Sequence, residues 1–142
     1  MATQLNRLEF KQCYPGYSQG LFILLSERRI PRGQDEVNVG QQLSSVLCDI
    51  QKSEREDQVT RVLTNTLGTY RAVSLIHLEI LFTPSLKLDV IRTLLSLCRN
   101  RKICLVWPGT MLDGKLLYAT PNRPEYYECD LRSLQDTYIV TE

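Results

Sequence analysis

The stretch R-A-V-S-L-I-H-L-E-I-L-F, residues 71–82, decides the fold, because its apolar residues crowd together without the spacing of a half-exposed helix. Gly68 precedes this stretch and Pro84 follows it, and both residue types interrupt regular structure. A run of this kind is typical of a strand that is buried on both faces of a parallel sheet. We therefore expect residues 72–78 to form the centre of such a sheet.

Further apolar runs predict partner strands at residues 20–26, 103–107 and 137–140. Apolar residues recur at helical spacing near 41–52, 54–67 and 85–99, and these segments predict three helices. Residues 36–39 predict a short edge strand, and residues 116–118 predict another after an Asp113-Gly114 turn. Strands that alternate with helices predict an α/β fold with a mostly parallel sheet.

The composition is that of one soluble domain, residues 1–142, with 43% hydrophobic and 23% charged residues. No apolar run is long enough to cross a bilayer, and the N-terminal segment lacks the apolar core of a signal peptide, so we expect a cytoplasmic protein. The net charge of +1 gives no overall attraction to nucleic acid or anionic lipid. Five scattered cysteines and one histidine predict neither a disulfide framework nor a metal site.

Uncommon motifs follow the first stretch in a fixed order: L-E-I-L-F-T-P-S-L-K-L-D at 78–89, L-L-S-L-C-R-N-R at 94–101, V-W-P-G at 106–109 and L-L-Y-A-T-P-N-R-P-E-Y at 116–126. Together they resemble BrxF, the family of small P-loop proteins from type 3 BREX bacteriophage-exclusion systems. The resemblance is close over the C-terminal half, whereas the N-terminal half matches only in the order of its elements. It implies a reduced, three-layer fold like that of P-loop NTPases, with a mostly parallel sheet, helices on both faces and a role in prokaryotic phage defence.

The loop after residues 20–26 departs from the pattern G-x-x-x-x-G-K-S/T, in which backbone N–H groups and the lysine bind phosphates and the hydroxyl binds magnesium. Residues 27–33 read E-R-R-I-P-R-G, without a lysine, and too few residues follow for the usual helix. Where the family has its magnesium aspartate and an asparagine, this chain has Ile76 and His77. We therefore expect a degenerate, non-catalytic protein without a nucleotide cofactor. The vestigial nucleotide site would comprise Ser26, Arg28, Arg29, His77 and Glu79, of which Glu79 matches a family acid.

His77 allows two interpretations. The first is a buried histidine at the end of its strand, hydrogen-bonded to a neighbouring loop. The second is a replacement ligand at the vestigial nucleotide site.

Two groups of basic residues are candidates for contact with an anion or a nucleic-acid backbone. One group lies in the loop after residues 20–26, and the other lies just before residues 103–107. In a parallel sheet these positions are at opposite edges, so we do not expect the two groups to form one groove. Nucleic-acid binding is therefore an alternative function that we do not favour, and a nucleotide-binding ATPase with an unconventional site is a second alternative. The groups are Arg28, Arg29 and Arg32, and Arg99, Arg101 and Lys102.

Aromatic and proline residues in the C-terminal part predict a protein-binding surface, because tyrosine and tryptophan commonly anchor interfaces. The missing helix would also leave the sheet uncovered near Phe22 and Leu24, which predicts self-association or an obligate partner there. We therefore expect an accessory or scaffold subunit of a BREX-like defence complex that acts through other subunits of that complex. The predicted surface comprises Trp107, Pro108, Tyr118, Pro121, Arg123, Pro124, Glu125 and Tyr126.

Overall fold

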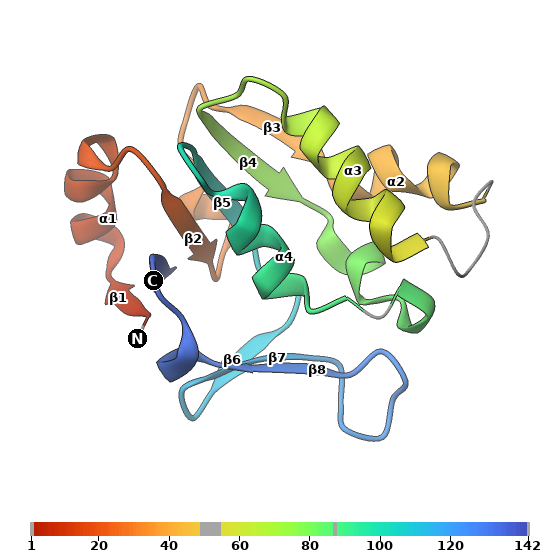
Figure 1. Cartoon of the computed structure of the whole chain (residues 1–142). Coiled ribbons are helices and arrows are strands. Elements are labelled where there is room, and N and C mark those ends of the chain that lie inside the picture. The colour runs from red at the N-terminus through yellow and green to blue at the C-terminus, as the bar shows by residue number, and fades with distance from the viewer. Residues whose placement is uncertain (1, 49–54, 87, 142) are drawn as a thin grey trace.

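Six parallel strands form the main sheet, in the order β1-β9-β2-β5-β4-β3. Figure 1 shows the neighbouring strands β2, β5, β4 and β3 of this sheet. The computed structural model describes residues 2–48, 55–86 and 88–141. It confirms the predicted α/β fold with a mostly parallel sheet. The strands are β1 (Thr3–Leu5), β2 (Gly20–Leu24), β3 (Asp35–Asn38), β4 (Ala72–Ile76), β5 (Lys102–Val106) and β9 (Thr137–Val140).

The centre of the sheet is β2 and β5, which pair in parallel from Gly20 opposite Lys102 to Leu24 opposite Val106. All five residues of β2 are buried, because strands flank it on both sides and side chains from other elements cover both of its faces. The prediction that residues 72–78 form the centre is wrong in position, since β4 lies next to the edge strand β3. β4 also ends at Ile76, because the backbone of His77 turns into the left-handed region with a φ of 57°.

The first face of the sheet packs against α2 (Val39–Cys48), α3 (Arg55–Leu67) and α4 (Val90–Leu97). In α4 the buried residues are Val90, Ile91, Leu94 and Leu97, and the Asp89 side chain caps the helix by accepting a hydrogen bond from the Arg92 N–H. The helix predicted at 85–99 begins late because residues 84–86 form a separate 3₁₀ turn. Residues 49–54, at the predicted boundary of the other two helices, lie outside the described residues. Within the described residues, no helix has both the length and the apolar character needed to cross a bilayer.

The second face is covered by α1 (Arg7–Cys13), which the sequence did not predict. The Asn6 side chain accepts a hydrogen bond from the Glu9 N–H, and Glu9 reaches back to Asn6, so the first turn is doubly capped. Phe10 then packs on Phe22, with ring centroids 5.9 Å apart, and Tyr14 meets the same ring edge-on at 4.9 Å. The prediction that this face is uncovered is therefore wrong, because neither Phe22 nor its neighbour on this face, Leu24, has any exposed surface. Helices lie on both faces, as predicted.

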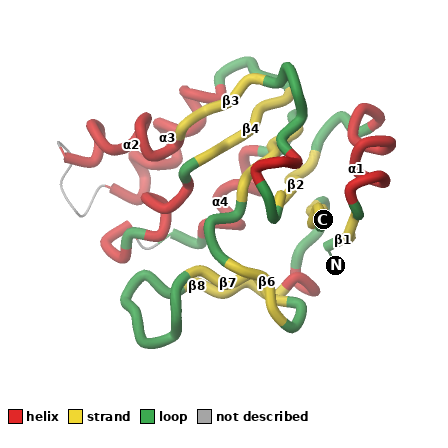
Figure 2. Tube along the Cα trace, turned by 180° about the vertical axis from the view of Figure 1, so that it is seen from behind, coloured by secondary structure: helices red, strands yellow, loops and turns green. Residues whose placement is uncertain are grey.

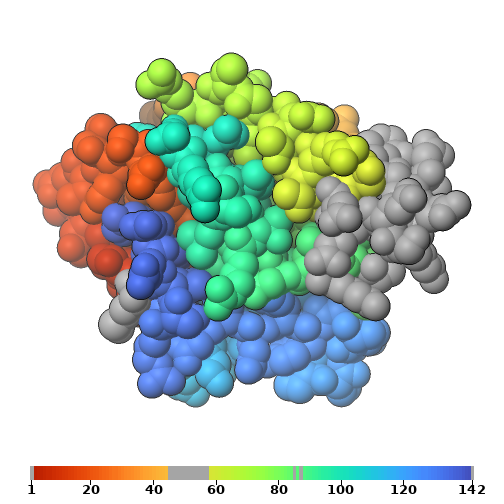
Figure 3. All heavy atoms as spheres, viewed as in Figure 1, coloured from red at the N-terminus to blue at the C-terminus, as the bar shows by residue number. Residues whose placement is uncertain are grey.

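The part of the chain between β5 and β9 forms a small antiparallel sheet. Asp113 and Gly114 both have positive φ, of 52° and 73°, so the tight turn predicted between its first two strands is present. Only the second strand was predicted, at residues 116–118; the first and third were not. In the space-filling view the blue C-terminal residues fill the lower part of the molecule, below the green residues of α4 (Figure 3). The strands are β6 (Thr110–Leu112), β7 (Lys115–Tyr118) and β8 (Tyr127–Asp130).

Gly109 lies at the entry to the small sheet, where the backbone leaves no room for a side chain. A Cβ atom at Gly109 would overlap the backbone oxygen of Leu117, which belongs to the paired strand β7 and cannot rotate away. We expect Gly109→Ala to lower the free energy of unfolding by about 2 kcal/mol or more. The matched control is Gly16→Ala, whose Cβ would meet no atom within 4 Å and which should stay within about 1 kcal/mol of the native chain. Urea denaturation measures both changes, and equal stability of the two variants would contradict this prediction.

Candidate functional site

Ser26 and His77 follow β2 and β4 at the carboxyl edge of the sheet, where parallel α/β sheets commonly bind ligands. The Ser26 hydroxyl accepts a hydrogen bond from the Arg28 N–H at 3.2 Å and caps the 3₁₀ turn η2 (Glu27–Arg29). The side chain of His77 is exposed, so the prediction of a buried histidine is wrong. Its backbone oxygen instead accepts from the Gly40 N–H at 3.1 Å and so fixes the first turn of α2. Glu79 is exposed as well, in the 3₁₀ turn η4 (Leu78–Phe82).

Residues 25–34, here called the crossing segment, connect the carboxyl end of β2 to the amino end of β3. The segment crosses the second face of the sheet beside α1 (Figure 2). Apart from the three residues of η2 it has no helix, whereas a parallel connection usually carries one. Ile30 packs with the aromatic cluster around Phe22. The crossing segment therefore occupies part of the space that a crossover helix would fill.

Gln34 holds the end of the crossing segment on the sheet. Its side-chain oxygen accepts a hydrogen bond from the Tyr14 hydroxyl, and its side-chain nitrogen donates to the Ser74 hydroxyl at 2.9 Å. Burial raises the pKa of Tyr14 well above its ordinary value, so its hydroxyl keeps the proton that it donates. Burial also raises the pKa of the Cys104 thiol, to about 11, so Cys104 stays neutral beside Tyr14 and Gln34. Uncharged side chains that hydrogen-bond to one another therefore lie between the end of the crossing segment and the sheet.

A cavity of 830 Å³ lies between α1 and the crossing segment. It contains residues from both predicted basic groups, so the prediction that these groups stay apart is wrong for Lys102. The physical reason is the path of the crossing segment, which returns to the amino edge where β5 begins. Arg99 lines a different hollow, and the guanidinium of Arg101 donates to the Gly68 backbone oxygen at 3.2 Å. We call this space the basic cavity, and its basic residues are Arg7, Lys11, Arg28, Arg29, Arg32 and Lys102.

The predicted protein-binding surface divides into a buried and an exposed part. Trp107 is only 4% exposed, and its ring N–H donates to the backbone oxygens of Thr110 and Leu117, both at 3.1 Å. Its prediction as an interface residue is therefore wrong, because it belongs to the core. Pro108, Tyr118, Glu125 and Tyr126 are half-buried, and Pro121, Arg123 and Pro124 are exposed. Five of these residues, Pro121 and Arg123 to Tyr126, lie in the loop between β7 and β8, which extends away from the main sheet (Figure 1).

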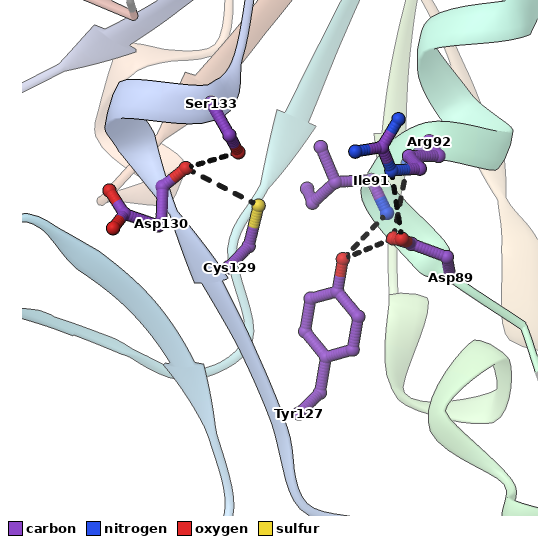
Figure 4. Close-up of polar contacts among 7 residues, drawn as sticks. All are labelled: Asp89, Ile91, Arg92, Tyr127, Cys129, Asp130 and Ser133. Carbon is purple, nitrogen blue, oxygen red and sulfur yellow. Dashed lines mark hydrogen bonds and ion pairs between the residues drawn. The ribbon is translucent and has the colours of Figure 1, made fainter.

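Tyr127 joins the small sheet to α4, and the sequence did not indicate this contact (Figure 4). Its hydroxyl donates to the Asp89 carboxylate at 2.7 Å and accepts from the Ile91 N–H at 3.2 Å. Asp89 also pairs with Arg92 at 3.2 Å. Burial, with the Asp89 carboxylate nearby, raises the pKa of Tyr127, so the hydroxyl stays protonated and keeps the sheet attached.

Three residues around the basic cavity were missed at the level of sequence. Arg7 and Lys11 belong to α1, and the Asn6–Glu9 capping pattern was the signal that could have found this helix. Gln34 had no such signal, because its partner Ser74 lies 40 residues further along the chain. Within the described residues, no group of three or more His, Cys, Asp or Glu side chains is placed to hold a metal ion.

No family model, no curated protein and no solved structure matches this chain. The resemblance of its motifs to the BrxF family therefore stays a prediction.

Gln34→Ala tests whether this side chain holds the crossing segment. The change leaves the buried Ser74 hydroxyl without its donor, so we expect the free energy of unfolding to fall by about 1–3 kcal/mol. Trypsin should also cut faster after Arg28, Arg29 and Arg32, because the segment that carries them is released. Gln12→Ala, at an exposed position of α1, is the control and should change neither measurement. Unchanged cleavage in the Gln34 variant would show that other contacts hold the segment.

Proposed function

We propose that this chain is a non-catalytic accessory subunit of a BREX-like bacteriophage-defence complex, with a reduced three-layer fold derived from P-loop NTPases. The strand order supports the derivation. If β1 and the small sheet are left out, the strands of the main sheet follow along the chain as β2, β3, β4, β5 and β9, numbered here first to fifth. Across the sheet they lie in the order fifth, first, fourth, third, second, which is characteristic of one large group of P-loop NTPases. The motifs at 78–126 support the role in phage defence, which would place the protein in the cytoplasm.

The path of the crossing segment is the observation that carries the non-catalytic role. In a P-loop enzyme the residues after this strand wrap the phosphates and continue into a helix, whose N-terminal N–H groups face the negative charge. Here the Ser26 hydroxyl accepts a hydrogen bond from the Arg28 N–H. The chain then crosses the face of the sheet without forming that helix. The lysine and the helix N-terminus are two principal contributors to phosphate binding, and both are lacking at this position.

The residue after β4 supports the same conclusion. A P-loop enzyme needs an aspartate near this position to hold its magnesium. This chain has Ile76 at the end of β4 and then His77, whose backbone turns to begin η4. The edge of the sheet that would hold a magnesium nucleotide therefore supports the start of α2 instead, through the His77 carbonyl.

The loop between β7 and β8 is the surface through which we propose contact with other subunits. Arg123 and Glu125 pair at 3.0 Å within the loop, and Arg123 and Pro124 are exposed. A hollow of 150 Å³ lies beside it, lined among others by Phe82, Pro124 and Tyr126. An exposed rim around an aromatic-lined hollow is an arrangement that accepts an anchoring side chain of a partner.

The non-catalytic role predicts that the purified chain does not hydrolyse ATP or GTP in the presence of magnesium. The physical reason is that neither the phosphates nor the metal has its usual ligands at the carboxyl edge of the sheet. Phosphate release is the measurement, with the same preparation plus a chelator as the control. Hydrolysis that stops on chelation and on Glu79→Gln would refute the proposal, because it would reveal an active site at this edge.

Co-expression of this chain with its neighbouring genes, followed by purification of the chain, tests the interaction surface. We expect at least one of them to co-purify with the native chain. The double variant Arg123→Ala/Pro124→Ala should reduce its recovery about tenfold, because exposed residues at the centre of an interface carry much of its energy. Arg61→Ala, an exposed position on α3, is the control and should leave recovery unchanged. Recovery that is the same for both variants would exclude this loop as the interface.

A further inference from the structure

The basic cavity carries a local excess of positive charge. Six basic side chains and one acidic side chain, Asp35, line it. Because the whole chain has 17 basic and 16 acidic residues, 11 basic and 15 acidic residues remain outside the cavity. The small net charge of +1 is therefore the sum of a positively charged cavity and a negatively charged rest of the chain. A hollow lined by one sign of charge focuses the electrostatic potential and attracts ligands of the opposite sign.

The basic side chains of the cavity have no carboxylate partners within the described part of the chain. The ion pairs found there are Arg92–Asp89, Arg123–Glu125 and Arg132–Asp130, all of them elsewhere. In addition, the Nε atom of Arg29 is buried and has no hydrogen-bond partner among the described residues. A buried donor without an acceptor is costly and uncommon in folded proteins. The absence of carboxylate partners for these cations points to an anionic ligand.

The contacts of the cavity hold one of these cations, Lys102, in place before a ligand arrives. The Lys102 ammonium donates to the Tyr14 backbone oxygen at 3.1 Å and lies 4.0 Å from the centre of the Tyr14 ring. Gln34 fixes the end of the segment that carries the three arginines. Cations that are already positioned lose little freedom on binding, which favours affinity.

The size and charge of the cavity decide the class of ligand. A volume of 830 Å³ lies within the range of sites for small molecules and exceeds what a single phosphate needs. A nucleic-acid strand carries one charge per nucleotide, and sites for single strands usually add aromatic rings on which bases stack. The two aromatic side chains of this cavity, Phe10 and Tyr14, are only 6% and 9% exposed, so they offer no such platform.

We propose that the basic cavity binds a compact oligophosphate, a ligand in which two or more phosphate groups are directly linked. This site lies on the second face of the sheet and reaches Ala72 and Lys102 at the amino edge, whereas a P-loop enzyme binds nucleotide at the carboxyl edge, so it goes beyond the proposed accessory function. The arginines and lysines neutralise the phosphates themselves. Magnesium therefore competes with them for the ligand and weakens binding, whereas it supports binding in a P-loop site.

Calorimetric titration with inorganic tripolyphosphate at low ionic strength tests the proposal. We expect saturable binding to the native chain, weakened by excess magnesium. The double variant Arg28→Ala/Arg32→Ala should bind at least about tenfold more weakly, because each arginine supplies charge-assisted hydrogen bonds. The control Arg61→Ala/Arg99→Ala removes the same charge at exposed positions outside the cavity and should stay within about twofold of native. Thermal melting of all three proteins verifies that the variants are folded.

Four results would overturn the proposal: no binding of tripolyphosphate, equal weakening in the two double variants, tighter binding with magnesium, or tighter binding of a single-stranded oligonucleotide than of tripolyphosphate. The last result would make the cavity a nucleic-acid site. The test is independent of the hydrolysis and co-purification experiments, because it measures neither phosphate release nor the recovery of a partner. Either proposal can therefore fail while the other holds.

Discussion

Ten residues connect β2 to β3, and this short connection determines how the second face of the sheet is covered. The segment has to pass two strands and reverse its direction, and a helical connection usually needs a dozen residues or more. No helix can therefore follow β2, and Phe22 would stay in contact with water. The chain resolves this with α1, which brings Phe10 and Tyr14 onto Phe22 from the other side of β2 in the sequence. A single seven-residue helix covers less than a full crossover helix, and the basic cavity is the space that remains.

Much of the sheet could be predicted because its strands are continuous apolar runs. The runs at β2, β4, β5 and β9 were all located, since burial on both faces leaves a clear pattern in the sequence. Their order across the sheet could not be predicted, because β2 and β4 have equally apolar runs and only pairing distinguishes them. β1 and α1 were missed for a different reason. β1 has three residues and α1 buries Phe10 alone, so neither shows a periodic pattern.

For the basic cavity, the sequence correctly indicated several of the residues but not how they are arranged in space. Arg28, Arg29 and Arg32 were correctly placed in the connection after β2, but the direction of that connection decides which other residues they meet. Trp107 illustrates the opposite error. A tryptophan before a proline and a glycine suggests an irregular, exposed position, yet two carbonyl oxygens accept from its ring N–H and allow it to be buried. Such contacts depend on residues from other strands, which sequence spacing does not reveal.

The position of β9 has a consequence for how the chain folds during synthesis. β9 lies between β1 and β2, so the first strand of the main sheet has its partner in the last strand of that sheet along the chain. Until residues 137–140 emerge, β1 stays unpaired and one edge of β2 is open. The growing chain therefore carries an unpaired sheet edge until β9 is available, and such edges pair readily with other chains. The aromatic cluster of α1 on Phe22 can form before then, which gives the nascent chain an early cover for the same region.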